Sequence, residues 1–188
     1  LLDIDPLIQR VSGLFDTGKL QGRTVLITAG PTREAIDPVR FISNHSSGKQ
    51  GYALAAAAAD AGANVILISG PTNLSPPERV EHVPVISAMQ MHEAVQARVA
   101  DIDVFIGVAA VADYRPTLTQ SQKMKKESHG KPTLTLELTE NPDIIAEVAA
   151  RHDKPFTVGF AAETQNLETF ARKKLAQKNL DMIVANNV

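Results

Sequence analysis

The chain of 188 residues contains no cysteine. This absence excludes a disulfide framework, a thiolate metal site and a catalytic protein thiol. Any sulfur chemistry that the protein performs must therefore use sulfur from a substrate.

The sequence also lacks an excess of one charge and a long apolar run. Nineteen basic and twenty-one acidic side chains leave a net charge of -2, which favours neither nucleic acid nor an acidic membrane surface as a partner. The longest apolar run, Ala53–Ala59, is too short to span a bilayer, and the first residues lack the basic-then-apolar order of a signal peptide. We therefore expect a cytoplasmic protein that binds neither nucleic acid nor a membrane.

Two common nucleotide-binding motifs are missing as well. There is no G-x-G-x-x-G, and Ser43 stands where a Walker A loop ending in Gly48-Lys49 would need its first glycine. The segment Ile42–Gly51 nevertheless joins an apolar strand to an alanine-rich helix through small and hydroxylated residues, among them Ser46, Ser47 and Gly48. Backbone N–H groups at such a helix start can bind phosphate, and Lys49 adds a positive charge. A plain connection with Ser or Asn capping the helix is the alternative.

What the chain does contain is enough hydrophobic sequence, 44%, for a full core. Residues Leu1–Gly22 have a mixed pattern that indicates a linker or short docking helix, and we expect one domain over residues 23–188. Within that domain, apolar runs alternate with helical patterns. The apolar runs are Thr24–Ala29, Asn64–Ser69, Val80–Val85, Val104–Val108, Thr157–Ala161 and Met182–Ala185. The helical patterns are Gly48–Ala61, Ala88–Val99, Asp143–Arg151 and Leu167–Lys178.

This alternation predicts an α/β fold, a Rossmann-like open and mostly parallel sheet with helices on both faces. One segment departs from it, because Thr133–Thr139 alternates strictly between polar and apolar residues as a half-exposed antiparallel strand does. The preceding polar stretch, Arg115–Pro132, is a candidate flap over a site.

Ligands of open α/β sheets bind beyond the carboxyl ends of the strands. Four polar or small-residue loops leave such ends in the predicted fold. They are Gly30–Lys49, Gly70–Leu74, Gly107–Tyr114 and Phe160–Thr164. Their convergence predicts a single site at that edge of the sheet.

Six strings in these regions together resemble one enzyme family, phosphopantothenoylcysteine synthetase. They are Thr28-Ala-Gly-Pro-Thr-Arg-Glu, Asp37-Pro-Val-Arg-Phe-Ile-Ser-Asn-His-Ser-Ser-Gly-Lys49, Ala109-Ala-Val-Ala-Asp-Tyr-Arg115, Lys123-Met-Lys-Lys126, Asn141-Pro-Asp-Ile144 and Val158-Gly-Phe-Ala-Ala-Glu-Thr164. The resemblance covers the chain from Gly22 to its end. Gln50 stands where the family often has methionine, and family members continue past Val188, so we expect the domain to be incomplete at its C-terminus.

The resemblance implies a ligase that activates the carboxylate of 4'-phosphopantothenate with CTP, releases pyrophosphate and joins the resulting acyl-cytidylate to cysteine. Magnesium is expected, because like charges must be neutralised when a carboxylate meets a triphosphate. The family also implies a homodimer, reached through Thr133–Thr139, and a flavin-dependent decarboxylase domain in the same parent chain. A first residue other than methionine agrees with a chain cut from such a parent.

The resemblance also implies roles for individual residues. Cytidine recognition is placed on Gly107, Val108, Ala109, Asp113, Lys123, Pro142, Asp143, Ile144, Ile145 and Phe160. Phosphate contacts are placed on Lys174 and Lys178, beside the loop of Ser46, Ser47 and Gly48. Asp113 is the candidate metal ligand, and Asn44, Lys123 and Arg40 are the candidate catalytic residues.

Taken without the family, these residues have ordinary readings. Asp113 suits a helix or turn cap, Phe160 a core position, and the lysines a solvated surface. His45 suits capping or packing better than general base catalysis. Two other functions stay open at this point: a nicotinamide- or flavin-binding oxidoreductase, and a non-catalytic nucleotide-binding module.

Overall fold

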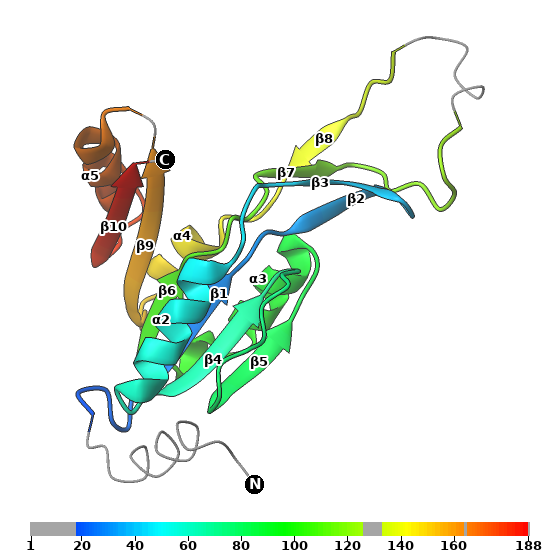
Figure 1. The fold of residues 1–188 in the computed structure, drawn as a ribbon. Helices are drawn as coiled ribbons and strands as arrows, with labels where there is room; N and C mark the ends of the chain where they lie inside the picture. The colour runs from blue at the N-terminus through cyan, green and yellow to red at the C-terminus, as the bar shows by residue number, and fades with distance from the viewer. Residues whose placement is uncertain (1–17, 126–132, 164, 188) are drawn as a thin grey trace, which may run out of the picture.

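The computed structural model describes residues 18–125, 133–163 and 165–187. Six parallel strands form the main sheet in the order β10-β9-β6-β1-β4-β5 (Figure 1). Their bounds are β1 Thr24–Ala29, β4 Asn64–Ser69, β5 Val80–Pro84, β6 Val104–Gly107, β9 Phe156–Glu163 and β10 Met182–Asn187. All five strand pairs of this sheet are parallel, which confirms the predicted fold class.

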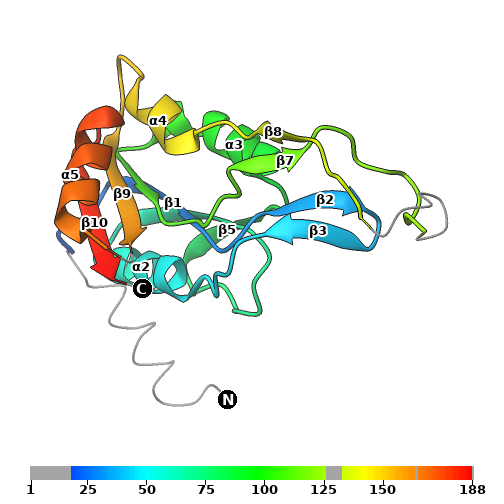
Figure 2. The same ribbon diagram turned by 90° about the horizontal axis from the view of Figure 1, so that it is seen from above.

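Helices cover both faces of the sheet, as predicted (Figure 2). They are α2 Lys49–Asp60, α3 Ala88–Gln96, α4 Ile144–Ala149 and α5 Leu167–Gln177, with a short 3-10 helix, η1, at Val99–Asp101. Alternate residues of β1 point to opposite faces. Val25 and Ile27 join a core cluster with α2, whereas Leu26 joins a second cluster with α3 and α4.

Helix α2 lies unusually close to the sheet. A Cβ atom built on Gly51 would lie 2.5 Å from the Cβ of Ala29, so no larger residue fits there without displacing the helix. The alanines that follow keep the approach close along the helix, and Ala55, Ala58 and Ala59 are buried. The alanine-rich pattern of the sequence therefore serves close packing of α2 on β1 and β4.

A second region, which we call the arm, extends from the carboxyl edge of the sheet (Figure 1). It consists of the antiparallel hairpin of β2 Arg33–Asp37 and β3 Arg40–Ser43 with the turn between them, the antiparallel pair β7 Tyr114–Pro116 and β8 Leu138–Glu140, and residues 117–125 and 133–137. Residues 117–125 follow β2, since the N–H of Gln120 donates to the carbonyl of Ile36 at 2.9 Å. The rest of the predicted flap, residues 126–132, lies outside the described residues.

The arm corrects two predictions. The strand expected over Thr133–Thr139 is wrong over its first five residues, because β8 begins only at Leu138. Its ladder with β7 runs from the pair Tyr114–Glu140 to the pair Pro116–Leu138, and beyond it the Thr117 N–H donates to the Glu137 carbonyl at 3.0 Å. The hairpin of β2 and β3 was not predicted within the loop Gly30–Lys49, because its largely polar, exposed sequence lacks a buried apolar face.

The amino edge of the sheet is closed by two aspartates. Asp103 accepts the Thr24 N–H at 2.8 Å and pairs with Arg23 at 2.7 Å, and both contacts lower its pKa. Burial raises the pKa of Asp181, but the Thr157 N–H and the Lys154 ammonium lower it by more, so it too lies below its ordinary value. Polar groups at this edge are thus paired with one another.

The predicted linker, residues 1–22, lies mostly outside the described residues. Its last part turns against the end of α2, where the Leu20 N–H donates to the Ala61 carbonyl at 2.9 Å. Within the described part of the chain, no helix has the length and apolar character needed to cross a membrane.

Candidate active site

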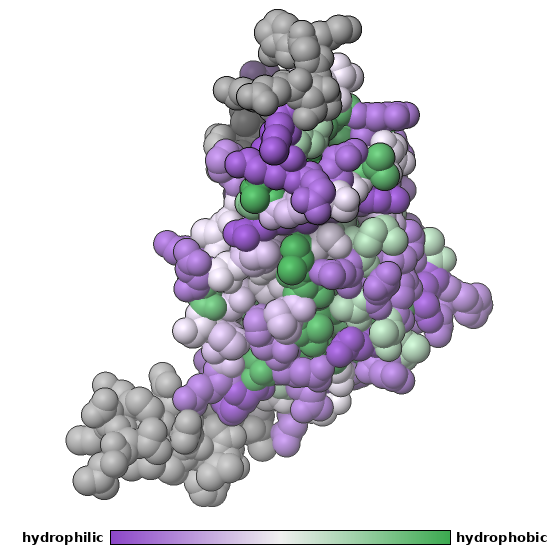
Figure 3. Space-filling view, turned by 90° about the vertical axis from the view of Figure 1, so that its right-hand side faces the viewer, coloured by the Kyte–Doolittle hydropathy of each residue, from purple (hydrophilic) through white to green (hydrophobic). Residues whose placement is uncertain are grey.

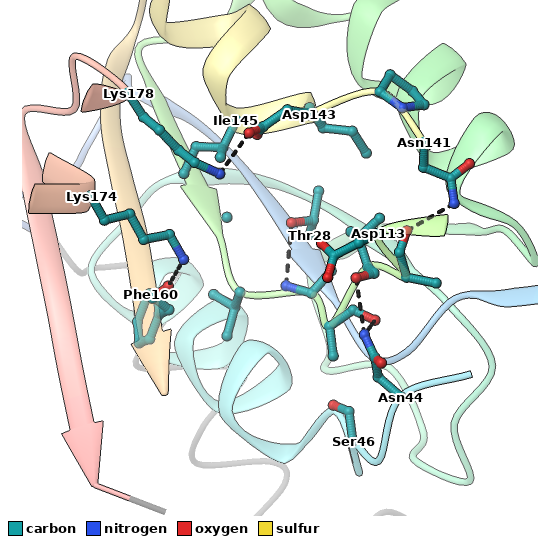
Figure 4. A pocket seen from close by; sticks show the side chains of 18 of the residues that line it. Thr28, Asn44, Ser46, Asp113, Asn141, Asp143, Ile145, Phe160, Lys174 and Lys178 are labelled. Atoms are coloured by element: carbon teal, nitrogen blue, oxygen red, sulfur yellow. Dashed lines mark hydrogen bonds and ion pairs between the residues drawn. The ribbon is translucent and has the colours of Figure 1, made fainter. Parts of the chain in front are cut away.

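A cavity of about 770 Å³ opens at the carboxyl ends of β1, β6 and β9 (Figure 4). From β1 the chain proceeds to β4 and β5 on one side of the sheet, and β6, β9 and β10 lie on the other. The strand order therefore reverses between β1 and β6. This is the place where open α/β sheets bind their ligands, because loops leave the two central strands in opposite directions.

The cavity brings together most of the site residues that the sequence analysis singled out. It is lined by Asn44, Ser46, Gly107, Val108, Ala109, Asp113, Pro142, Asp143, Ile144, Ile145, Phe160, Lys174 and Lys178. Two of the four predicted loops, Gly30–Lys49 and Gly107–Tyr114, contribute to it. The prediction of a loop over Phe160–Thr164 is wrong, because β9 continues to Glu163, but Phe160 lines the cavity from that strand. The fourth, Gly70–Leu74, supplies no lining residue and instead places Thr72 against Gly30 and Gly48.

The loop that follows β6 forms the floor of the cavity. Thr28, on β1, accepts the Ala109 N–H through its hydroxyl at 3.5 Å. The Asn44 side-chain amide donates to the carbonyls of Ala110 at 3.3 Å and Val111 at 3.0 Å. Side chains from two other segments thus fix the path of this loop, and Asn44 is directed into the site rather than onto the start of α2.

Lys174 of α5 and Lys178, the residue that caps the end of this helix, face the cavity from one wall (Figure 4). Lys174 donates to the carbonyl of Phe160 at 2.7 Å, and Lys178 pairs with the carboxylate of Asp143 at 2.7 Å. Asp143 also accepts the Ala146 N–H and so caps α4. The spacing of four residues places both ammonium groups on one face of the helix, where they can meet an anion together.

The serine-rich loop lies at the opposite wall. Gly48 is the N-cap of α2 in a left-handed conformation (φ 76°), and no side chain caps the helix there. The expected capping of α2 by a Ser or Asn side chain at the N-cap is therefore wrong. The hydroxyls of Ser46 and Ser47 accept the N–H groups of Gly48 at 3.3 Å and Lys49 at 3.4 Å. Ser46 lines the cavity, whereas Ser47 and Gly48 do not.

Arg40 and Lys123 lie in the arm and do not line this cavity. The Arg40 guanidinium binds the buried carboxylate of Asp37, at 3.0 Å through Nε and 2.5 Å through Nη2, and the carbonyl of Met124 at 3.1 Å. Asp37 in turn accepts the N–H groups of Arg40 at 2.9 Å and Met124 at 3.1 Å. Arg40 therefore lies near Lys123, although the two are far apart in the sequence, because its guanidinium binds the carbonyl of the next residue, Met124.

Electrostatics hold this part of the arm together. The Arg40 side chain, followed by the backbone N–H groups around it, keeps the pKa of Asp37 well below its ordinary value despite burial of the carboxyl. Asp37 is therefore a permanent anion at neutral pH, and Arg40 is its main counterion.

The carboxylates of the cavity suit a magnesium ion that is coordinated mainly by phosphate oxygens and water. Asp113, Glu140 and Asp143 line the cavity. Among the described residues, no three His, Asp or Glu side chains gather closely enough to hold a metal by themselves. Mg²⁺ prefers one or two carboxylates together with phosphate oxygens and water, and this donor set fits that preference.

Sequence reasoning missed several lining residues, among them Thr28, Phe105 and Asn141. Thr28 and Asn141 each open one of the strings on which the family resemblance rests, so the signal was present in the sequence. Phe105 gave no such signal, because a buried aromatic in a strand reads as core. His45 also lines the cavity.

Comparison with known proteins identifies the kind of domain. The sequence matches the family described as DNA/pantothenate metabolism flavoprotein C-terminal domain over residues 20–188. The coenzyme A biosynthesis bifunctional protein CoaBC of Vibrio parahaemolyticus is 57% identical over 189 residues, which cover 100% of this chain and 47% of that protein. The chain thus spans about half the length of the curated relatives it matches.

Solved structures agree. The crystal structure of the C-terminal domain of CoaBC is 51% identical, with a TM-score of 0.78 over 89% of this chain and 78% of that one. A Cab2 mutant in complex with phosphopantothenate-cysteine has a TM-score of 0.76 over 98% of this chain and 80% of that one. At 19% identity, this second likeness concerns the fold alone.

Proposed function

The chain belongs to the family of DNA/pantothenate metabolism flavoprotein C-terminal domains, and from this premise we propose that it is a phosphopantothenate–cysteine ligase that uses CTP. The observation that carries the proposal is the cavity at the strand-order reversal, which has two lysines on one wall and a serine-rich loop on the other. A nucleotide triphosphate and a second phosphorylated substrate both need cations and N–H groups of this kind.

The proposed reaction has two steps. In the first, the carboxylate of 4'-phosphopantothenate attacks the α-phosphorus of CTP, the bond to the β-phosphate breaks and pyrophosphate leaves. In the second, the amine of cysteine attacks the acyl carbon, a C–N bond forms, CMP leaves with the electron pair and the amine loses a proton. The absence of protein cysteine is compatible with this chemistry, since the thiol belongs to the substrate.

For the nucleotide, we propose that cytosine lies against Gly107–Ala109, Pro142–Ile145 and Phe160. Their backbone groups can distinguish the 4-amino group of cytosine from the 4-oxo group of uracil, because donor and acceptor are exchanged. A wrong base would leave a buried polar group unpaired, at a cost of about 1–3 kcal/mol. Asp113, which lines the cavity beside this loop, would bind a ribose hydroxyl or the metal.

For the phosphates, we propose that Lys174 and Lys178 exchange their present partners, the Phe160 carbonyl and the Asp143 carboxylate, for triphosphate oxygens. Release of Asp143 would then place a second carboxylate near the metal. Magnesium bound there would neutralise the triphosphate and polarise the α-phosphate. The loop of Ser46, Ser47 and Gly48 is assigned to phosphate binding at the opposite wall.

Asn44 is assigned to the second step. Its amide already lies at the cavity wall, directed at the Ala110 and Val111 carbonyls, so a short rotation would let it donate to the acyl oxygen as cysteine attacks. Lys123 is assigned to the first step, where its charge would stabilise the pentavalent phosphate, and Arg40 to binding a carboxylate or phosphate.

The location of Arg40 and Lys123 in the arm favours a homodimer. Neither residue lines the cavity of its own chain, and the arm exposes apolar side chains such as Phe41, Leu118 and Leu134. Figure 3 views the molecule from the side of the arm and shows hydrophobic patches among the polar groups. We propose that two arms pair and that Lys123 reaches the cavity of the partner. The remaining half of the parent chain is assigned to the flavin-dependent decarboxylase, and the whole to the cytoplasm.

Thermal unfolding with nucleotides tests the proposal. CTP with magnesium should raise the melting temperature far more than ATP, GTP or UTP at equal concentration, because a ligand stabilises the state it binds. NAD and FMN serve as controls for an oxidoreductase. Equal shifts for the four triphosphates would remove the cytidine assignment. A turnover assay with CTP, 4'-phosphopantothenate and cysteine then separates an enzyme from a module that only binds nucleotide.

A further inference from the structure

One residue in the loop after β6 has both of its backbone groups bound by side chains. The Ala112 N–H donates to the hydroxyl of Thr32 at 2.9 Å, and the Ala112 carbonyl accepts from the side-chain amide of Asn141 at 2.8 Å. Ala112 is 3% exposed and Thr32 is fully buried. Backbone groups of a loop that are buried in this way need partners, and here they come from two separate segments.

Asn141 is itself held in one orientation. Its backbone N–H donates to the Asp113 carbonyl at 2.8 Å, and Arg115 donates to its side-chain oxygen at 3.0 Å and to the Glu140 carbonyl at 2.6 Å. Because the arginine can only donate, the amide oxygen must face it and the amide nitrogen must face Ala112. Figure 4 shows Asn141 directed at this loop from the segment that leads to α4.

We propose that Thr32 and Asn141 are positioning residues that fix Ala112, and through it the adjacent Asp113, for binding of the nucleotide. This rests on the proposed function. Thr32 lies directly before β2, and Asn141 lies directly after β8. Residues that flank two strands of the arm therefore hold the loop that follows β6. A shift of the loop by about 1 Å would be enough to spoil ligand alignment.

The test compares matched threonine variants of this chain. Thr32→Val removes the acceptor of the Ala112 N–H with almost no change of shape, and Thr32→Ser keeps it. Thr157→Val is the control, because Thr157 is equally buried and also hydrogen-bonded, to the Pro155 carbonyl at 2.9 Å, but it lies at the opposite edge of the sheet. Melting temperature, the KM values for CTP and cysteine, and the preference for CTP over UTP are measured for each.

We expect Thr32→Val to raise the KM for CTP by roughly tenfold and to reduce the preference for CTP, with the KM for cysteine unchanged. Thr32→Ser should restore both. Thr157→Val should lower the melting temperature without changing the KM for CTP. The proposal is overturned if the two valine variants behave alike, or if the KM values for CTP and cysteine rise together.

Asn141→Asp provides the second arm of the test. It keeps the oxygen that faces Arg115 but removes the donor to the Ala112 carbonyl, so it should also raise the KM for CTP selectively. If both Thr32→Val and Asn141→Asp only unfold the protein, the two residues are structural and the proposal fails. Failure of the unaltered chain to bind CTP would instead overturn the proposed function, a result that needs no variant to detect.

Discussion

The sheet and the arm differ in how far their apolar side chains are buried. In the sheet, Leu26 and Ile27 are 0% exposed, and each lies in a core cluster of its own face. In the arm, Val39 is 57% exposed and Leu118 is 70% exposed. The sheet therefore completes its core within one chain, whereas the arm leaves apolar surface that a second molecule can cover.

The arm holds its shape by polar contacts instead. Asp37, whose side chain is fully buried, accepts hydrogen bonds from Arg40, Val39 and Met124. Such a network specifies one conformation because the carboxylate cannot lose its donors without a large cost in solvation. The comparison suggests that the sheet supplies stability and the arm supplies geometry.

The largest expected effect is the loss of folding stability that a substitution in the core of the sheet causes. Phe105→Ala removes a side chain that is 1% exposed and should lower the free energy of unfolding by about 3–5 kcal/mol. Phe41→Ala removes one that is 49% exposed and should cost about 0.5–1 kcal/mol, mostly from its contact with the Arg33 guanidinium. Urea unfolding at low protein concentration measures both.

The two substitutions should rank in the opposite order when self-association is measured instead of stability. Sedimentation velocity on the two variants should show weaker self-association for Phe41→Ala and unchanged association for folded Phe105→Ala. Equal effects of the two substitutions on stability would break the distinction between sheet and arm.

The sheet was also the more predictable of the two regions. The bounds of β1 and β4 follow from apolar runs such as Thr24–Ala29 and Asn64–Ser69, because a strand buried on both faces must be apolar throughout. The hairpin Arg33–Ser43 has no such signature. Its pairing depends on Asp37, which reads as a turn residue in sequence and acts as a buried acceptor in the structure.

The residues of the site also differ in how well their positions could be predicted, depending on whether the sheet or the arm carries them. Gly107 ends β6 and Phe160 follows its pairing partner Gly159 in β9, so the sheet topology brings both to the cavity. The positions of Arg40 and Lys123 depend on the path of the arm, which local pattern does not determine. The roles of Thr32 and Asn141 depend on contacts between segments far apart in the chain, and no spacing in the sequence reveals those.

A second expected effect tests the junction of the two regions at Asn44. Asn44→Ala should still form acyl-cytidylate but transfer it to cysteine about 10²–10³-fold more slowly, because a donor to the developing oxyanion is lost. Quenched-flow mass spectrometry should show the intermediate accumulating. If Asn44 only orders the loop through Ala110 and Val111, both steps will slow together.

A third, smaller effect tests the arm. Lys123→Gln should slow pyrophosphate release by about 10–100-fold, since a charged hydrogen bond in the transition state is worth about 1.5–3 kcal/mol. The melting temperature should not change, because Lys123 is exposed. Lys173→Gln makes the same charge change at an exposed position of α5 and serves as the control. Unchanged pyrophosphate release in Lys123→Gln would make Lys123 an ordinary surface lysine.

The smallest effect concerns pH. Because the folded-state pKa of Asp37 is lowered, its contribution to stability is fully present above its ordinary value of 3.8 and is lost only as the pH falls through the lower, folded-state value. The amide resonances of Arg40 and Met124 should therefore stay constant from pH 7 down to about pH 4 and move only below it. Asp37→Asn should displace them already at neutral pH. Titration of these amides centred near the ordinary value would contradict the buried network.

The strand order has a consequence for folding of the chain during its synthesis on the ribosome. Thr24 in β1 must wait for Asn64 in β4, and Val25 must wait for Val104 in β6, before either edge of β1 is covered. Closing such long loops is slow, and an uncovered strand edge invites pairing with other nascent chains. The central strand is thus the first of the sheet to be synthesised, and its pairing with β6 joins residues farther apart in the chain than any other strand pair of this sheet. A chaperone that shields Thr24–Ala29 during translation should therefore have more effect on yield than one that acts after release.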